Sequence, residues 1–122
     1  MEYMLLIFES EKAWGGMSEA QKAAGFREYM TFTEDVKKKG HYKSGNPLQP
    51  TSTATTVRVR DGKTLATDGP YAETKEQLGG YYLIEADTVD EALEWAAKIP
   101  SARYGTIEVR PLVPMPAETH AG

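Results

Sequence analysis

Two short segments of this chain, residues 3–8 and 80–86, are apolar on both of the faces that a β-strand presents. The first reads YMLLIF, so the side chains that point to either side of the strand are hydrophobic. Such strands are covered on both faces in folded proteins. One layer of helices covers one face of a sheet, so we expect the other face to pack against a second copy of the chain.

Two amphipathic patterns predict helices. Residues 18–39 begin with a capping box, Ser18 and Gln21, and run into three lysines and Gly40, which suit the C-terminal end of a helix. Residues 88–99 begin with a second capping box, Thr88 and Glu91, and end before Pro100. Helical spacing predicts the inward residues Ala23, Phe26, Met30, Thr33 and Val36 in the first helix, and Ala92, Leu93, Ala96 and Ile99 in the second.

The remaining segments complete the order of elements. Residues 41–53 contain one glycine and two prolines and are expected to form a loop with some extended residues. Residues 55–60 and 63–67 form a hairpin around Asp61-Gly62, and residues 105–110 form the last strand, with Ile107 and Val109 inward. The order predicts an α+β fold, a ferredoxin-like antiparallel sheet with two helices on one face. We expect one domain over 1–112 and a proline-rich tail over 113–122.

Composition excludes several classes of protein. The net charge of −4 argues against nucleic acid as a partner, and no stretch approaches the about 20 apolar residues of a membrane span. The chain has no cysteine and two histidines, His41 and His120, which lie far apart, so we expect no metal and no cofactor. The N-terminal residues lack the basic region of a signal peptide, so the expected location is cytoplasmic.

The segment with the most chemistry is residues 68–84, which read DGPYAETKEQLGGYYLI. A stiff turn and four charged side chains directly precede an apolar strand. Asp68 is a candidate catalytic acid or base, or a ligand anchor; alternatively it accepts backbone N–H groups in its own turn. Glu73 and Lys75 are candidate ligand-binding residues, although a solvated charged loop explains them as well and is the better explanation for Glu76.

Other side chains have the same double interpretation. Tyr71 and Tyr82 are candidate ligand-binding residues through their hydroxyl groups, whereas strand aromatics more often belong to a core or an interface. Arg58 is a candidate for binding an anionic group, or a residue on the polar face of the hairpin. Gly79 and Gly80 either allow a ligand or a facing chain to approach the backbone, or form a bulge where the strand begins.

Several of these motifs together resemble the YCII-related, or DGPF-domain, family. The matching residues are 55–62, 67–84, 91–96 and 107–111, and the resemblance extends over roughly 1–112. Tyr71 stands where the family name has phenylalanine. The resemblance implies a homodimer in which two sheets pack face to face as a dimeric α+β barrel, with a pocket in each subunit and a cytoplasmic location.

The resemblance implies two kinds of function. Some members of the family are similar to small lyase-type or dehalogenating enzymes, and one branch has been proposed to use a histidine of the first helix with an aspartate just before the proline that ends the second. Here the first helix has no histidine, and Ile99 precedes Pro100. One hypothesis is therefore a protein that binds a small polar organic molecule near Asp68, with lyase-like activity. The alternative is a non-catalytic sensor or partner module in an extracytoplasmic-function sigma-factor pathway, because such genes often neighbour this subgroup.

Overall fold

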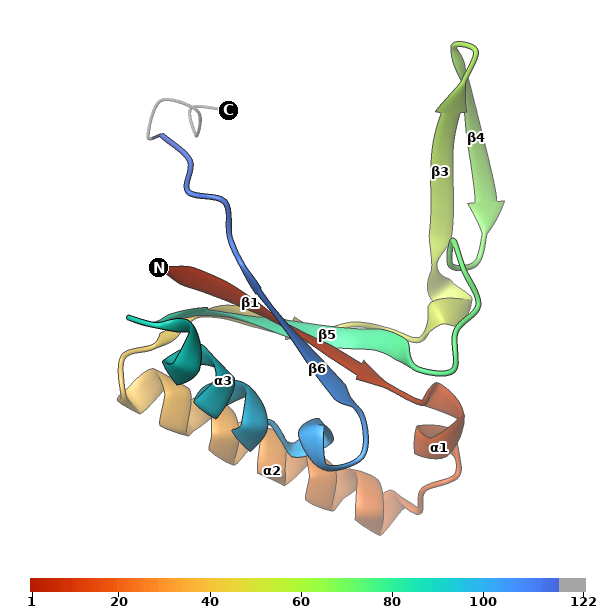
Figure 1. Ribbon diagram of the computed structural model, residues 1–122. Helices are drawn as coiled ribbons and strands as arrows, with labels where there is room; N and C mark the ends of the chain where they lie inside the picture. Colours follow the sequence, from red (N-terminus) through yellow and green to blue (C-terminus); the bar gives the residue numbers. More distant parts are fainter. Residues whose placement is uncertain (117–122) are drawn as a thin grey trace.

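The computed structural model describes residues 1–116. Its strands and helices are shown in Figure 1. In order they are β1 (Glu2–Glu9), α1 (Glu11–Gly15), α2 (Glu19–Lys38), β2 (Tyr42–Pro47), β3 (Thr55–Arg60), β4 (Lys63–Asp68), β5 (Gln77–Glu85), α3 (Val89–Lys98) and β6 (Thr106–Pro111), with 3₁₀ turns at Thr51–Thr53 and Pro100–Arg103. No helix within this part of the chain is long and apolar enough to cross a membrane.

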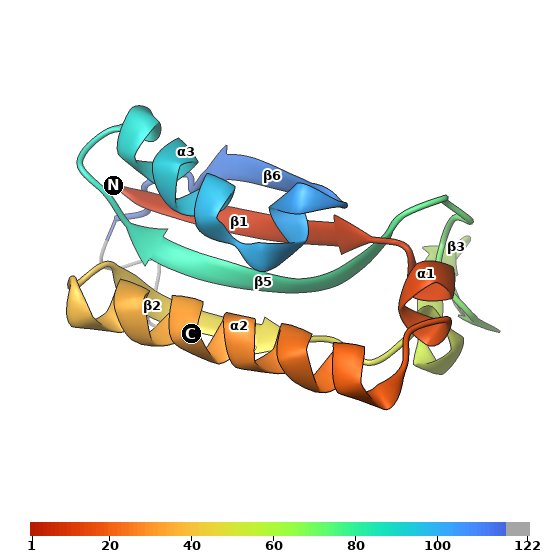
Figure 2. The same ribbon diagram turned by 90° about the horizontal axis from the view of Figure 1, so that it is seen from below.

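Four strands form one antiparallel sheet in the order β2-β5-β1-β6. Helices α2 and α3 both lie on the same face of this sheet (Figure 2). The central strands β1 and β5 are the two segments that are apolar on both faces, and they pair with each other from Glu2↔Glu85 onward. The arrangement is the predicted α+β fold with a ferredoxin-like antiparallel sheet, which is confirmed.

The core lies between the sheet and the helices. Leu5 of β1, Ile84 of β5, Val36 of α2 and Ile99 after α3 are almost completely buried. Phe32 contacts both Tyr82 and Trp95 edge to face, with ring centroids 5.1 and 6.2 Å apart, an arrangement that aromatic pairs prefer. Alternate residues of β1 and β5 supply the sheet side of this core, so its position follows from the period of two of a strand.

Both helices begin where the capping motifs predict. At α2 the Ser18 hydroxyl accepts a hydrogen bond from the Gln21 N–H, and the Gln21 side chain accepts one from the Ser18 N–H. At α3 the Thr88 hydroxyl accepts from the Glu91 N–H, but the Glu91 carboxylate accepts from Asp87, one residue earlier than a capping box requires. The N-terminal signals therefore fix both helix starts.

The predicted inward faces of the helices are partly wrong. Phe26 and Met30 of α2 are 65% and 57% exposed, and Leu93 of α3 is 48% exposed. The inward stripe of α2 consists of the predicted Thr33 and Val36 together with Tyr29 and Phe32, and Trp95 replaces Leu93 in α3. Apolar residues lie on more than one side of α2, so helical spacing alone allows two inward faces, and packing against the sheet selects one.

Residues 41–53, predicted as a loop with some extended residues, contain the regular edge strand β2. This strand has few residues that favour β-structure, and its pairing with β5 holds it in place. Gly45 allows β2 to approach the Tyr82 ring of β5, because a Cβ at this position would lie 2.7 Å from a ring carbon of Tyr82. The hairpin β3–β4, in contrast, belongs to a separate two-stranded sheet.

A β-bulge interrupts the pairing of β1 with β5. Ile7 pairs with Gly80 and Phe8 with Leu78, so Gly79 is the extra residue. The bulge predicted as one interpretation of Gly79-Gly80 is present. A Cβ at Gly80 would lie 3.0 Å from the Asn46 carbonyl oxygen, so the close approach of a neighbouring strand also depends on glycine here.

The face of the sheet opposite the helices carries an apolar surface that we call the bare face. Its residues on β1 and β5 are half-buried rather than buried, in alternation with the core residues. The apolar members are Met4, Leu6, Phe8, Tyr81 and Leu83. No helix of the described part of the chain packs on this side (Figure 1).

Candidate functional site

A cavity of about 860 Å³ lies where the hairpin meets the four-stranded sheet. We call it the hairpin-base cavity. Its walls come from the end of β1, the chain on either side of the hairpin, the start of β5 and the start of β6. The side chains that matter for its chemistry are Phe8, Tyr71, Glu76, Leu78, Thr106 and Glu108.

Short hydrogen bonds hold the two loops that form its walls. The Gly69 N–H donates to the Ala54 carbonyl over 2.7 Å, and the Thr56 hydroxyl donates to the Gly69 carbonyl over 2.8 Å. Gly69 has a φ of 102°, which a side chain would strain. On the other side, the Glu11 carboxylate of α1 accepts bonds of 2.8 and 2.7 Å from the N–H and hydroxyl of Thr51. Helix α1, which the sequence did not predict, therefore anchors the base of the hairpin.

Glu76 is the charged side chain of the signature segment that the fold brings to the cavity. The Thr106 hydroxyl of β6 donates to its Oε1 over 2.8 Å, and its other oxygen has no hydrogen bond to the described residues. Glu108 lies two residues further along β6 and also lines the cavity. Two carboxylates beside an apolar wall of Phe8 and Leu78 can accept hydrogen bonds from a ligand that carries N–H or O–H groups.

The structure separates the residues predicted for the site. Tyr71 lines the cavity and is 82% exposed. Asp68 ends β4 and is exposed, and within residues 1–116 its carboxylate makes no hydrogen bond. The turn is therefore not held by this side chain, contrary to one of the two predicted roles. Glu73 and Lys75 are exposed and do not line the cavity.

The two remaining predicted residues lie elsewhere. Arg58 is exposed in the middle of β3, away from the cavity walls. Tyr82 is buried on the helix side of the sheet, and its hydroxyl lies 2.7 Å from the Thr33 hydroxyl. Burial raises the pKa of Tyr82, and the hydrogen bond with Thr33 opposes this effect. Tyr82 thus belongs to the core, which was the other predicted interpretation.

A buried polar cluster lies near the same end of β1, on the helix side of the sheet. The hydroxyl of Ser101, which has no exposed surface, donates to Glu9 Oε2 over 2.9 Å and is also hydrogen-bonded to the Tyr29 hydroxyl. Burial raises the pKa of Tyr29 well above its usual range. Tyr29 lies on α2 and Ser101 directly follows Pro100, so the cluster joins α2 to the turn after α3.

No sequence signal pointed to this cluster, because each member stands alone on its own element.

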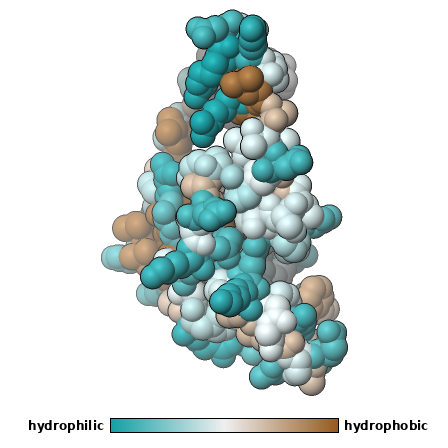
Figure 3. All heavy atoms as spheres, turned by 90° about the vertical axis from the view of Figure 1, so that its right-hand side faces the viewer, coloured by the Kyte–Doolittle hydropathy of each residue, from teal (hydrophilic) through white to brown (hydrophobic). Residues whose placement is uncertain are grey.

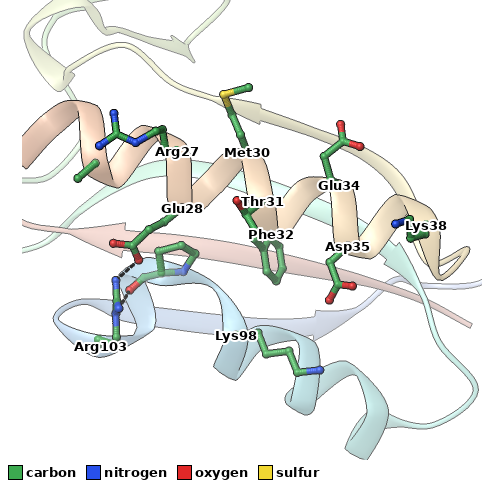
Figure 4. Close-up of a pocket in the computed structure, with 12 residues that line it drawn as sticks. Arg27, Glu28, Met30, Thr31, Phe32, Glu34, Asp35, Lys38, Lys98 and Arg103 are labelled. Atoms are coloured by element: carbon green, nitrogen blue, oxygen red, sulfur yellow. Dashed lines mark hydrogen bonds and ion pairs between the residues drawn. The ribbon is translucent and has the colours of Figure 1, made fainter.

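A second hollow, of about 1010 Å³, lies on the outer side of the helices (Figure 4). It is an open groove in which Arg103 pairs with Glu28, and further charges of both signs line it, from Glu34, Asp35, Lys38 and Lys98. The charges of both signs along the groove indicate no single class of ligand, and we favour the hairpin-base cavity.

The residues that the structure describes contain no group of three or more histidine, cysteine, aspartate and glutamate side chains that could hold a metal ion. His120, one of the two histidines, lies outside the described residues. His41 contacts the Glu85 carbonyl through Nδ1 over 2.7 Å and lies against Trp95, with ring centroids 5.3 Å apart. It is therefore part of the packing around α3.

Comparison with known proteins gives two results. The sequence model of the YCII-related domain matches residues 1–116. The chain is also similar to "Uncharacterized protein R00369" of Rhizobium meliloti (strain 1021), with 36% identity over 114 residues, which is 92% of each chain. The matched region includes both strands with two apolar faces, the hairpin and the hairpin-base cavity.

Proposed function

The chain belongs to the family of YCII-related proteins, and from this premise we propose that it is a cytoplasmic homodimer that binds a small polar organic molecule in the hairpin-base cavity. The observation that carries the proposal is the position of the signature segment. Residues 70–72, 74 and 76–78 of this segment all line one cavity of about 860 Å³. Ligand sites in proteins are concave, mostly apolar and contain a few placed polar groups, which describes these walls.

The chemistry of the walls indicates the class of ligand. Glu76 and Glu108 are acceptors, Thr106 already donates to Glu76, and Tyr71 adds a hydroxyl. A molecule with an amine or several hydroxyl groups satisfies such acceptors, whereas a carboxylate or phosphate is repelled. Asp68 does not line the cavity but precedes the lining residue Pro70 by two positions, and it is the residue from which we propose that acid–base chemistry of the lyase type would start.

The bare face supports the proposed homodimer. Apolar side chains line it, and large apolar patches on soluble proteins mark contact sites. A second copy that packs its own bare face here buries both surfaces and adds a wall to the cavity, which shares Phe8 with the bare face. This is the dimeric α+β barrel expected from the family resemblance.

A non-catalytic module in a sigma-factor pathway is the second candidate. It is favoured because α2 has no histidine and Ile99 precedes Pro100, so the histidine–aspartate pair proposed for one branch of the family is not available. Between α2 and the turn after Pro100, the hydroxyl groups of Tyr29 and Ser101 are hydrogen-bonded to each other, and Ser101 also donates to Glu9. Neither hydroxyl group is an efficient proton acceptor at neutral pH. In this case the ligand would act as a signal and would be released without chemical change.

A thermal-shift screen of small amines, polyols and sugars tests the proposal. A ligand that binds the folded protein alone raises the melting temperature by mass action. We expect Glu76→Gln, which retains an acceptor for Thr106, to lose most of this shift. Glu73→Gln is the matched control, because Glu73 is exposed outside the cavity. An equal shift in both variants would show that the ligand binds elsewhere, and turnover of the ligand separates an enzyme from a sensor.

A further inference from the structure

The hairpin β3–β4 projects from the body of the molecule as a two-stranded arm (Figure 1). Every residue of its two strands except Thr56 is exposed. The strands pair in continuous register from Thr55↔Asp68 to Arg60↔Lys63, and the predicted Asp61-Gly62 turn joins them with φ angles of 52° and 74°. Its geometry is therefore regular, although it has no covering layer in the described residues.

An exposed arm of this kind needs a partner surface. A two-stranded hairpin is marginally stable in water at best, because its side chains bury little area. Val57 and Val59 share one side of the arm and are 60% and 59% exposed, and Leu65 on the other side is 48% exposed. Burial of these side chains under another surface would lower the free energy of the assembly.

The position of the arm indicates where that surface is. The arm stands on the side of the sheet that the helices leave open, next to the bare face (Figure 1). Two copies that pack through their bare faces would each lie beside the arm of the other. The base of the arm contributes Thr55 and Thr56 to the hairpin-base cavity, so a copy held by the arm also lies at the cavity mouth.

Charge favours a second copy as the partner. Residues 55–68 contain three cations, Arg58, Arg60 and Lys63, against Asp61 and Asp68, a net charge of +1. The whole chain has a net charge of −4, so the remaining residues together carry −5. In a space-filling view, hydrophilic side chains dominate the projecting hairpin and a hydrophobic patch interrupts them (Figure 3). A basic arm on an acidic body is electrostatically complementary to another copy of that body.

We propose that the β3–β4 arm clasps the body of a second copy, and that Val57 and Val59 become buried there. The proposal rests on the homodimer of the proposed function and adds a reciprocal contact to it. Each arm contacts the body of the other copy, as the twofold symmetry of a dimer requires. The arm thus packs against a surface that a single chain does not provide.

The experiment measures the dimer dissociation constant by analytical ultracentrifugation for the native chain and for Val57→Thr/Val59→Thr. Threonine retains the branched shape and the strand preference of valine but buries poorly. We expect the dissociation constant to rise at least tenfold. Val89→Thr at the start of α3 is the matched control, because Val89 is 49% exposed on the helix side, and it should leave the constant unchanged.

Hydrogen exchange of the arm amides provides an independent measurement. We expect exchange within residues 55–68 to slow when the concentration is raised through the dissociation constant, and this slowing to disappear in the double variant. If the native chain is a dimer and the double variant has the same dissociation constant and the same hydrogen exchange in the arm, the arm contact alone is overturned. A native chain that is monomeric at all concentrations overturns the homodimer as well. Protection that appears only with a different protein also overturns the proposal.

Discussion

The Ser101 hydroxyl donates a hydrogen bond to Glu9 Oε2 over 2.9 Å, although the two residues are 92 positions apart. This bond joins the end of β1 to the 3₁₀ turn after α3, and the Tyr29 hydroxyl joins the same oxygen of Ser101 to α2. One hydroxyl thus links the sheet to both helical segments beneath it.

Replacement of this hydroxyl should be costly. In Ser101→Ala, the half-buried Glu9 and Tyr29 each lose a hydrogen-bond partner at a residue that itself has no exposed surface, and an unsatisfied buried polar group costs about 1–3 kcal/mol. We expect the free energy of unfolding in urea to fall by that amount. Ser52→Ala, at an exposed position, should change it by less than about 0.5 kcal/mol. Equal effects of the two substitutions would show that the cluster adds no stability.

The stability of the protein should depend on Tyr29 at alkaline pH. Because burial raises the pKa of Tyr29 in the folded state, the folded chain retains a proton that the unfolded chain releases above its ordinary pKa of about 10. The stabilisation that the protonated Tyr29 contributes to the folded state is complete below about pH 10 and is lost as the pH rises further. Urea unfolding from pH 8 to 11 should therefore show that the native chain loses stability faster than Tyr29→Phe. Parallel curves would contradict a buried, protonated Tyr29.

Asp68→Asn separates a structural role from a binding role. The turn is held by Gly69 with Ala54 and Thr56, so we expect the melting temperature to change little, within about 0.5 kcal/mol of stability. If Asp68 contacts a ligand bound in the hairpin-base cavity, the affinity for a ligand found in the thermal-shift screen should fall about tenfold, which corresponds to about 1.4 kcal/mol. A folded variant with native affinity removes Asp68 from the site.

The bare face predicts a dimer that a single charge can separate. Light scattering at micromolar concentration should give twice the chain mass of 13.5 kDa. Leu6→Arg places a charge in the centre of the bare face and should yield a folded monomer. Leu93→Arg, at an exposed position of α3, should remain dimeric. A native chain that is monomeric and soluble would refute the barrel arrangement.

Two glycines should respond to alanine in opposite directions. A Cβ at Gly105 would lie 2.3 Å from the Phe8 carbonyl oxygen, so Gly105→Ala must displace backbone and should destabilise the fold by at least about 1–3 kcal/mol. Gly15 at the end of α1 has nothing within 4 Å of such an atom. Gly15→Ala should be neutral or stabilise by up to about 1 kcal/mol. Thermal unfolding of both variants checks the prediction.

Much of the fold could be predicted because its signals are local. Ser18 and Gln21 lie within one turn of helix, and Asp61-Gly62 forms a turn from its own backbone preferences, so neighbouring residues determine both features. The two-faced apolar pattern of β1 and β5 likewise identifies the central strands. The candidate site was predicted in part: the signature segment does line a cavity, but through Tyr71 and Glu76 rather than through Asp68, Glu73 or Lys75.

The remaining features depend on contacts between distant residues. The sequence by itself determined the helix starts, the hairpin turn and the central strands, because each needs only a few adjacent residues. Tertiary structure decided that β2 is a strand, since β5 supplies its hydrogen bonds, and that Phe32 rather than Phe26 faces the core, since the sheet accepts one side of α2. It also brought Glu9 to Ser101. Residue type and spacing along the chain carry no information about which separate segments meet, because that depends on how the layers pack.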